Sequence, residues 1–393
     1  MLSRRPLIVL IVLLSMFGPI STDMYLSGLP QMMEDFGTTE AVMNVSLYLF
    51  MLIFAFSILI LGPTGDKYGR RKVLIISMAV YAVASFSCSL CQDVGSFILM
   101  RGIQAIGAGG GLTAAFALIK DCFKGKEMSH ILSITAALGV LGPIMSPVLG
   151  ALMISLIDWR ATFWIPGTIS LICLLLATGL SPAIPEVRKT SVVNAVKSVF
   201  SIAKDSNFLL FTLMMTVFTS SMLAYISVSS YVYQNDFGFD PNQFSAMLAI
   251  GCLTGLVISI TLRRLPAITP RKMLLALFSL GLIGLTIMST LGNKEWFFFL
   301  MAIIPVTAVC TTTRSFGFGI LMSNHDGDNG AVSSILNFST FILAFFGMMI
   351  ASSFPNDAFV YGVATVMAIS CTTFFVCWMV IRRRGYPLAG LDR

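Results

Sequence analysis

Twelve apolar segments, separated by short polar stretches, dominate this sequence of 393 residues. A helix of about 20 mostly apolar residues crosses a bilayer, and lipid-exposed backbone must satisfy its hydrogen bonds within the helix. We therefore expect an all-α membrane protein with 12 transmembrane helices. The segments are 6–27, 41–61, 73–90, 97–119, 131–156, 161–180, 208–233, 244–262, 273–291, 296–321, 331–353 and 359–381.

Composition supports a membrane environment and argues against a nucleic-acid partner. Only 11% of the residues are charged and 56% are hydrophobic, whereas a soluble domain is about a quarter charged. The net charge of +7 comes from cations at the ends of apolar segments, not from one basic face. Nearly all of them lie in the N-terminus, the even-numbered loops and the C-terminus, and only Arg160 and Lys294 lie in odd-numbered loops. The positive-inside rule then places both termini in the cytoplasm.

The longest polar break divides the segments into two sets of six. We expect one six-helix bundle over residues 1–181, a cytoplasmic linker over 182–206, and a second bundle over 207–393. An amphipathic pattern over 192–203 predicts that the linker contains a helix lying on the membrane surface. The N-terminal cations precede an apolar run without a small-residue cleavage site, so we interpret that run as a retained first span.

Two ionisable residues inside spans are the main candidates for chemistry. Asp23 lies in the first segment, in the run ISTDMY, and Arg101 lies in the fourth, in RGIQAIG. Ionisable groups in a membrane are costly and usually functional, and a carboxyl there could load and release a proton. Asp23 could instead lie where water reaches it near the outer mouth. Arg101 could be tied to backbone carbonyls, and Gln104 shares its helix face.

The fifth segment carries the run GVLGPIMSPVLG, residues 139–150. Each proline removes a backbone donor and bends a helix, while the glycines leave one face open to close packing. The residues of this pattern are Gly139, Gly142, Pro143, Pro147 and Gly150. We interpret the segment as a kinked packing helix.

A charged run, GPTGDKYGRRK, lies at 62–72 between the second and third segments, and we expect it to form a glycine-hinged turn. This run, the R-x-x-Q-x-x-G of the fourth segment and the pattern of the fifth together resemble the major facilitator superfamily. The runs STDMYL at 21–26 and AYISVSSYVYQ at 224–234 resemble its Bcr/CflA branch of drug:proton antiporters. Ser27, where those relatives usually have proline, and Arg314 depart from the branch.

The resemblance implies roles for residues that spacing alone does not assign. It implies proton coupling through Asp23 and Arg101, and it implies that the fifth-segment pattern is that of exporters rather than importers. It also implies a cytoplasmic gate formed by Asp66, Arg70, Arg71 and Asp121, although a solvated surface cluster would look the same in sequence.

Aromatic, methionine and polar residues of the spans are candidates for the wall of a substrate cavity between the halves. Such residues also commonly face lipid or pack in the core. Arg314 could extend its charge to the membrane surface or bind an anionic substrate. The candidates are Tyr25, Tyr48, Met51, Gln104, Tyr225, Tyr231, Asn337, Phe338, Phe341 and Arg314.

From the sequence we therefore expect a proton-coupled exporter of small lipophilic drugs or toxic compounds in the inner membrane of a prokaryote. A dedicated amino-acid or sugar transporter of the same fold is the alternative, and a non-transporting receptor or scaffold is a more distant one. An enzyme is not expected, because no nucleophile–base pair or metal cluster is visible. We expect no cofactor and no metal, and as partners a small-molecule substrate, protons and the bilayer. The protein is expected to act as a monomer.

Overall fold

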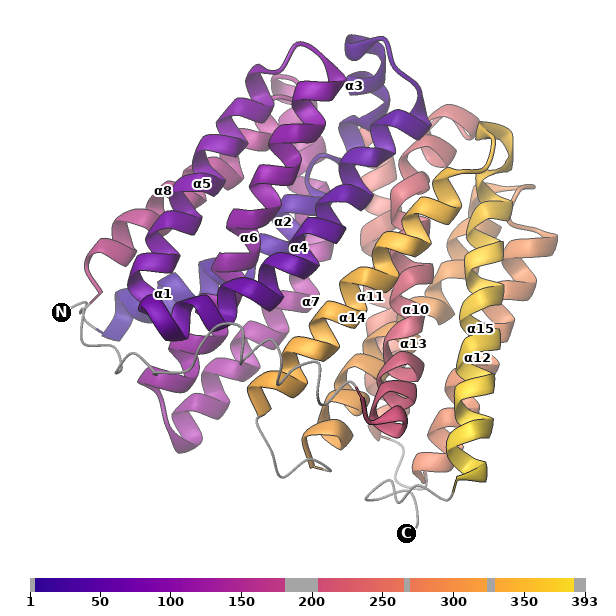
Figure 1. The fold of residues 1–393 in the computed structure, drawn as a ribbon. Coiled ribbons are helices and arrows are strands. Elements are labelled where there is room, and N and C mark those ends of the chain that lie inside the picture. The colour runs from indigo at the N-terminus through magenta and orange to yellow at the C-terminus, as the bar shows by residue number, and fades with distance from the viewer. Residues whose placement is uncertain (1–3, 181–203, 265–268, 324–328, 385–393) are drawn as a thin grey trace. The chain divides into compact units, whose positions relative to one another are not determined.

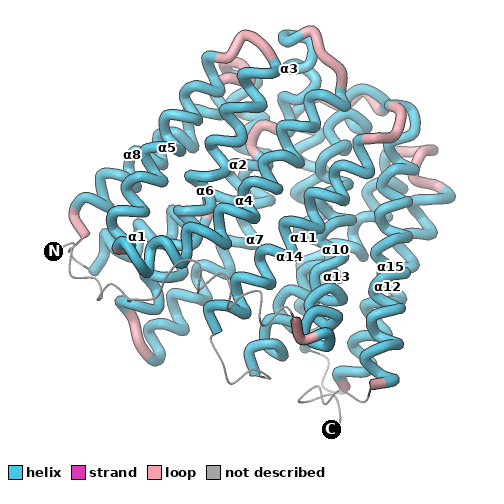
Figure 2. The backbone as a smooth tube through the Cα atoms, viewed as in Figure 1, coloured by secondary structure: helices cyan, strands magenta, loops and turns pink. Residues whose placement is uncertain are grey.

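The computed structural model describes residues 4–180, 204–264, 269–323 and 329–384, and these residues form helices joined by short loops, with no strand (Figures 1 and 2). The chain divides into two compact units, Met1–Lys197 and Ser198–Arg393. The amphipathic pattern expected at 192–203 lies outside the described residues.

The expectation of an all-helical membrane protein is confirmed. Eleven helical stretches of the described chain are long and apolar enough to cross a membrane, and the apolar part of a further helix, Leu141–Leu156, supplies the twelfth. The first unit contains α1 (Arg4–Ser15), α2 (Phe17–Asp23), η1 (Leu26–Gly28), α3 (Leu29–Phe36), α4 (Glu40–Tyr68), α5 (Arg70–Leu90), α6 (Val94–Cys122), α7 (Gly125–Leu156) and α8 (Ala161–Thr178).

The first span is broken, where the sequence predicted one continuous helix over 6–27. It consists of α1, α2, the short helix η1 and α3, and it extends to Phe36. Pro30 stands in the first turn of α3, where a missing backbone donor is tolerated.

The charged run at 62–72 is also different from the predicted turn. Helix α4 continues through Pro63 to Tyr68, and α5 begins at Arg70. The only residue between the two helices is Gly69, whose φ of 96° is favourable only for glycine. The turn is therefore one residue long, and most of the charged run is helical.

Helix α6 packs against α4 and α5 through a run of glycines. A β-carbon on Gly107 would lie 2.6 Å from the carbonyl oxygen of Ser77 on α5, and one on Gly109 would lie 2.5 Å from the β-carbon of Ser57 on α4. These distances are shorter than any van der Waals contact, so only glycine permits the approach. Gly107 therefore leaves room for the close approach of α5.

The second unit contains α10 (Ser206–Tyr231), η2 (Val232–Asp236), α11 (Pro241–Arg264), α12 (Pro270–Thr290), α13 (Trp296–Ser323), α14 (Asn329–Ser352), η3 (Asn356–Ala358) and α15 (Phe359–Arg383). Helix α10 packs against α13, α14 and α15, and α11 packs against α13. The segment η2 is a π-helix that continues α10, and segments of this kind are frequent near functional sites.

Candidate functional site

The carboxyl group of Asp23 lies at the C-terminal end of α2, at the break in the first span. It is 5% exposed and accepts a hydrogen bond of 2.7 Å from the hydroxyl of Thr22. None of the ion pairs among the described residues includes it. Asp23 is thus a buried acid with one neutral hydrogen-bond donor.

Helix α7 shapes this break with the residues of the fifth-segment pattern. A β-carbon on Gly150 would lie 1.7 Å from the carbonyl oxygen of Met24, and one on Gly142 would lie 2.7 Å from the ring of Pro19. The hydroxyl of Ser27 donates to the carbonyl of Pro147 at 3.4 Å. The pattern therefore packs directly on the broken segment that carries Asp23.

Helix α7 runs without interruption past both of its prolines, Pro143 and Pro147. Gly139 also lies in α7, but its surroundings are outside what the structure describes.

Arg101 of α6 is completely buried within the first unit. Its guanidinium lies between two aromatic rings, 4.5 Å from the centroid of Tyr25 and 4.4 Å from that of Phe50. Nη1 donates to Oε1 of Gln104, and the amide of Gln104 donates to the hydroxyl of Ser85 at 2.7 Å. The pairing of Arg101 with Gln104 on one helix face, predicted from their spacing, is confirmed.

Two nitrogens of this guanidinium, Nε and Nη2, have no hydrogen-bond partner in the described structure. The cation–π contacts supply part of the missing stabilisation, at about 2 kcal/mol for a desolvated pair. A buried charge with unused donors is costly and usually marks a functional site. The contacts described for Arg101 are with the side chains of Gln104, Tyr25 and Phe50, not with the backbone carbonyls that the structural alternative required.

An aromatic cluster surrounds Tyr25 and extends from Arg101 toward the loop between α7 and α8. Tyr25 contacts the rings of Phe97 and Phe163 at centroid distances of 6.2 and 5.5 Å. Its hydroxyl is 3.1 Å from that of Ser46 on α4. Trp159 also contacts Phe97 and Phe163. Tyr25 and Gln104, predicted for a cavity wall, thus lie in the interior of the first unit beside Arg101.

Sequence reasoning missed several members of this site. Phe50 and Phe163 looked like any other aromatic residue of a span. A further buried polar residue of the first unit, not placed in this site by any contact, is Asn44 of α4, and neither of its amide atoms has a partner among the described residues. The rule that singled out Asp23, a strongly polar residue within a span, would also have found Asn44.

The other cavity candidates are distributed over both units. In the first, Met51 is buried and Tyr48 half-buried. In the second, Tyr225 and Tyr231 are buried, and the hydroxyls of Tyr225 and Tyr233 are 3.1 Å apart. Asn337 donates to the carbonyl of Ser333 within α14, Phe338 and Phe341 are half-buried, and Arg314 is exposed.

Three of the four predicted gate residues form one ion cluster. Arg70 begins α5 and binds Asp66 of α4 at 2.5 Å and Asp121 of α6 through Nε. One guanidinium thereby joins the ends of three helices. Arg71 is directed elsewhere: its Nη2 and Nε donate to the carbonyls of Thr178 and Ala177, at the C-terminal end of α8.

Two helical units rich in membrane spans, with a buried acid and a buried cation in the first, define a multi-pass membrane transporter. The profile of the Major Facilitator Superfamily matches residues 11–348, and the chain belongs to this family.

Two members of the family are similar to this chain over most of its length. The chain is 29% identical over 277 residues to an uncharacterized MFS-type transporter, YdgK, of Bacillus subtilis, covering 69% of each chain. It is 27% identical over 328 residues to the multidrug resistance protein MdtL of Klebsiella pneumoniae, covering 81% of each.

Solved structures share the fold at low sequence identity. A bacterial homologue of the human lysosomal transporter Spinster, in an inward-facing and occupied conformation, matches with a TM-score of 0.72 and 12% identity, covering 97% of both chains. A D-xylose–proton symporter matches with a TM-score of 0.68 and 13% identity, covering 94% of this chain and 97% of that one.

Proposed function

We propose that the protein is a proton-driven exporter of small lipophilic compounds, including drugs, across the cytoplasmic membrane of a bacterium. The observation that carries the proposal is the carboxyl of Asp23, buried at the break of the first span with only the Thr22 hydroxyl as its partner. A buried acid without a counter-ion can exchange a proton at modest cost in either direction.

The proposed mechanism couples this proton to a change in the first span. When Asp23 is ionised, its charge favours any arrangement that brings it toward water or toward a cation. When it is protonated, the buried position beside Thr22 is favoured. Because Met24 and Ser27 contact Gly150 and Pro147 of α7, a shift at the break would be transmitted to that helix.

Arg101 supplies a fixed positive charge within the same unit. Its unused donors, Nε and Nη2, would bind an ionised carboxylate that approached them, whether that of Asp23 or of a substrate. In the proposed cycle, the two units alternate in access as Asp23 gains a proton from outside and releases it inside. Export of substrate accompanies proton entry.

The drug class rests on the relatives named multidrug resistance proteins, at 27% identity or less. The cation distribution supports cytoplasmic termini by the positive-inside rule. In that orientation the cluster of Arg70, Asp66 and Asp121 would lie on the cytoplasmic side, where we propose that it acts as a gate.

Transport by purified protein in proteoliposomes with an imposed pH gradient tests this proposal. Chloramphenicol or tetraphenylphosphonium is added, and proton movement is followed with an enclosed pH-sensitive dye. We expect drug-dependent proton movement in the wild type and its loss in Asp23→Asn. The matched control is Asp93→Asn, at the exposed N-cap of α6, because asparagine caps a helix as well as aspartate does.

The other outcomes separate the alternatives. Proton movement that follows an amino acid or a sugar but no drug would replace the proposal with a metabolite transporter. Drug-coupled movement that survives in Asp23→Asn would keep the exporter but remove Asp23 as its proton carrier.

A further inference from the structure

Helices α12 and α15 of the second unit pack side by side and antiparallel (Figure 1). The ring of Phe278 on α12 stacks on that of Phe375 on α15 at a centroid distance of 5.5 Å. One turn away, a β-carbon on Gly281 would lie 3.3 Å from the sulfur of Cys371. These two contacts fix the register of the pair, and the start of α12 therefore lies level with the end of α15.

Four cations gather at this level on the surface of the unit. Each helix extends about two turns, or 10 Å, beyond the contact between the phenylalanine rings before it reaches them. All four residues are exposed, and none takes part in an ion pair of the described chain. They are Arg271 and Lys272 in the first turn of α12, and Arg382 and Arg383 in the last turn of α15.

The two cations of α12 occupy an unfavourable position. The first turn of a helix carries unpaired N–H groups and the positive end of the helix dipole, so it favours anions. Arg271 and Lys272 stand there with no acidic residue in the turn. Thr269 caps one N–H group, because its hydroxyl accepts from the backbone of Lys272 at 3.3 Å. A bound anion would stabilise the charges that remain.

In the first unit, the helix that begins with a similar sequence has acids of its own chain beside it. The run RKVL at 71–74 of α5 resembles RKML at 271–274 of α12. Next to the first run, Arg70 binds Asp66 and Asp121. The segment that joins α11 to α12 contains no Asp or Glu. The cations of α12 therefore lack the counter-ions that the start of α5 has.

The acid that precedes α10 does not replace them. It lies near the end of α15, since Arg384 donates to Ser206 and Asn207. The carboxylate of Asp205, however, accepts from the backbone N–H groups of Asn207 and Phe208 at 2.9 and 3.4 Å. Asp205 thus caps α10 and takes part in none of the ion pairs of the described chain.

Apolar and aromatic side chains follow the cations along the same two helices. Leu275, one turn from Arg271, is 43% exposed, and Phe375 is 41% exposed. Trp378, one turn from Arg382, is half-buried, with its ring 6.4 Å from that of Phe375. Tryptophan is enriched where the headgroups of a membrane meet its apolar interior. This surface therefore combines cations for a headgroup with an apolar face for acyl chains.

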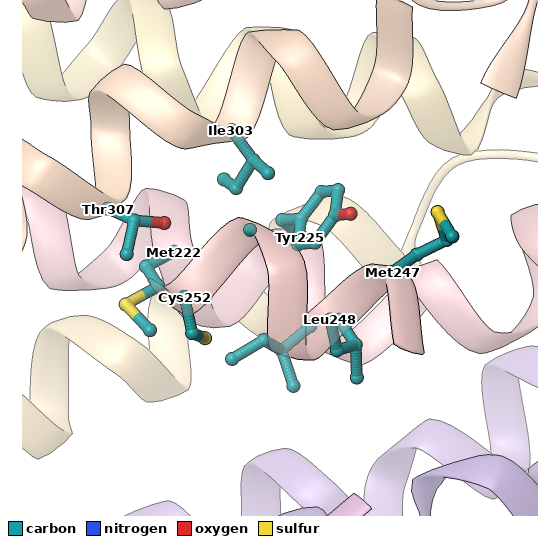
Figure 3. A pocket seen from close by; sticks show the side chains of 9 residues that line it. Met222, Tyr225, Met247, Leu248, Cys252, Ile303 and Thr307 are labelled. Atoms are coloured by element: carbon teal, nitrogen blue, oxygen red, sulfur yellow. The ribbon is translucent and has the colours of Figure 1, made fainter. Parts of the chain in front are cut away.

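The second unit also has an interior gap between α10, α11 and α13, lined in part by Met222, Leu248 and Ile303 (Figure 3). The gap has room for about one water molecule. Neither α12 nor α15 contributes to its lining. A ligand for the four cations must therefore bind on the outer surface of the unit.

We propose that the start of α12 and the end of α15 bind the headgroup of an anionic phospholipid. The four cations contact its phosphates, and its acyl chains lie along Leu275, Phe375 and Trp378. Four cations exceed the charge of one phosphate group, so a lipid with two phosphates, such as cardiolipin, fits best. In the proposed orientation the site lies in the cytoplasmic leaflet. The inference does not depend on which compound the protein transports.

Native mass spectrometry of the purified full-length chain in detergent tests the proposal. The probe is cardiolipin, and phosphatidylcholine with the same acyl chains, which has no net charge, is the comparison. We expect the wild type to retain cardiolipin and to lose phosphatidylcholine. The double variant Arg271→Gln, Arg382→Gln removes one cation from each helix. It should weaken cardiolipin binding by about 25-fold, since each cation near an anionic headgroup contributes about fivefold.

Two further variants separate a site from a general effect of charge or folding. Lys124→Gln with Lys126→Gln removes two exposed cations at the start of α7 in the first unit, and it should bind cardiolipin as the wild type does. Arg271→Lys with Arg382→Lys keeps both charges and should retain most of the binding. Loss in the glutamine variant alone would then come from the missing charges.

Equal retention of the two lipids would overturn the proposal. So would a glutamine variant that binds cardiolipin like the wild type, or a first-unit variant that loses as much. Displacement of cardiolipin by equimolar inorganic phosphate would assign the cations to free phosphate and reject a lipid site. None of these measurements uses a proton gradient, so a failed lipid site leaves the proposed export standing, and absence of drug-coupled proton movement leaves the lipid site standing.

Discussion

The carbonyl oxygen of Met24 occupies the space that a side chain on Gly150 would need, with only 1.7 Å between that oxygen and the position of a β-carbon. Met24 belongs to the break in the first span, and Gly150 belongs to the proline-containing helix α7. The acid at residue 23 therefore has its position set by a glycine more than a hundred residues away in the chain.

Gly150→Ala should consequently displace the broken segment. Forcing a methyl group into a packed contact costs about 1–3 kcal/mol, and here the obstacle is backbone that cannot rotate away. We expect a lower thermal unfolding temperature in detergent and loss of transport. Gly18→Ala is the control: it lies in α2 near the same break, with nothing within 4 Å of its β-carbon position. A Gly150→Ala protein as stable and active as Gly18→Ala would contradict the assignment.

Arg101→Lys should impair transport although it keeps the positive charge. The guanidinium of Arg101 lies over the rings of both Tyr25 and Phe50, and a compact, strongly hydrated ammonium would not reproduce both contacts. Loss of about 1.4 kcal/mol of this interaction corresponds to a tenfold lower rate, the size of effect we expect. The comparison is Arg160→Lys, where the cation stacks on Trp159 at 4.4 Å but is partly exposed. The transport rates of the two variants are compared at equal protein density, and we expect the rate of Arg101→Lys to be the lower one.

Arg70→Lys should reduce transport more than Arg71→Lys. Arg70 joins Asp66 and Asp121 with two different nitrogens, and a single ammonium cannot span both carboxylates in that geometry. Arg71 donates to two backbone carbonyls at the end of α8, a role that lysine can fill. Initial rates of drug uptake into everted vesicles measure the difference. Equal rates would indicate that the cluster is a solvated surface feature.

Asp35→Ala should loosen α3 from the loop between α7 and α8. Its carboxylate accepts from the indole of Trp159 at 2.8 Å and from Arg160 at 3.2 Å. We expect a loss of about 1 kcal/mol, the usual contribution of such a hydrogen bond. Thermal unfolding followed by tryptophan fluorescence measures it. The neighbouring Glu34→Ala, on an exposed side chain of the same helix, should have little effect.

The sequence predicted the spans well because a run of about 20 apolar residues has a single stable solution in a bilayer. It also identified Asp23 and Arg101, since a charge inside an apolar run is visible without any structure. The glycine hinge predicted within 62–72 is present at Gly69, but the turn is shorter than predicted. Its charges and glycines resemble loop residues, yet α4 accommodates Pro63 and continues to Tyr68.

The surroundings of the two charged residues were not predictable in the same way. Phe50 and Phe163 enclose Arg101 although nothing in the sequence distinguishes them from other aromatic residues of spans.

By itself, then, the sequence determined that the chain crosses a membrane many times and where its costly charges lie, because transfer to lipid depends on the composition of each segment alone. Tertiary structure decided that the first span breaks at Asp23, that Gly150 receives the Met24 carbonyl, and that Arg101 is stacked with donors unused. These features depend on contacts between residues far apart in the chain, and close packing specifies such contacts residue by residue.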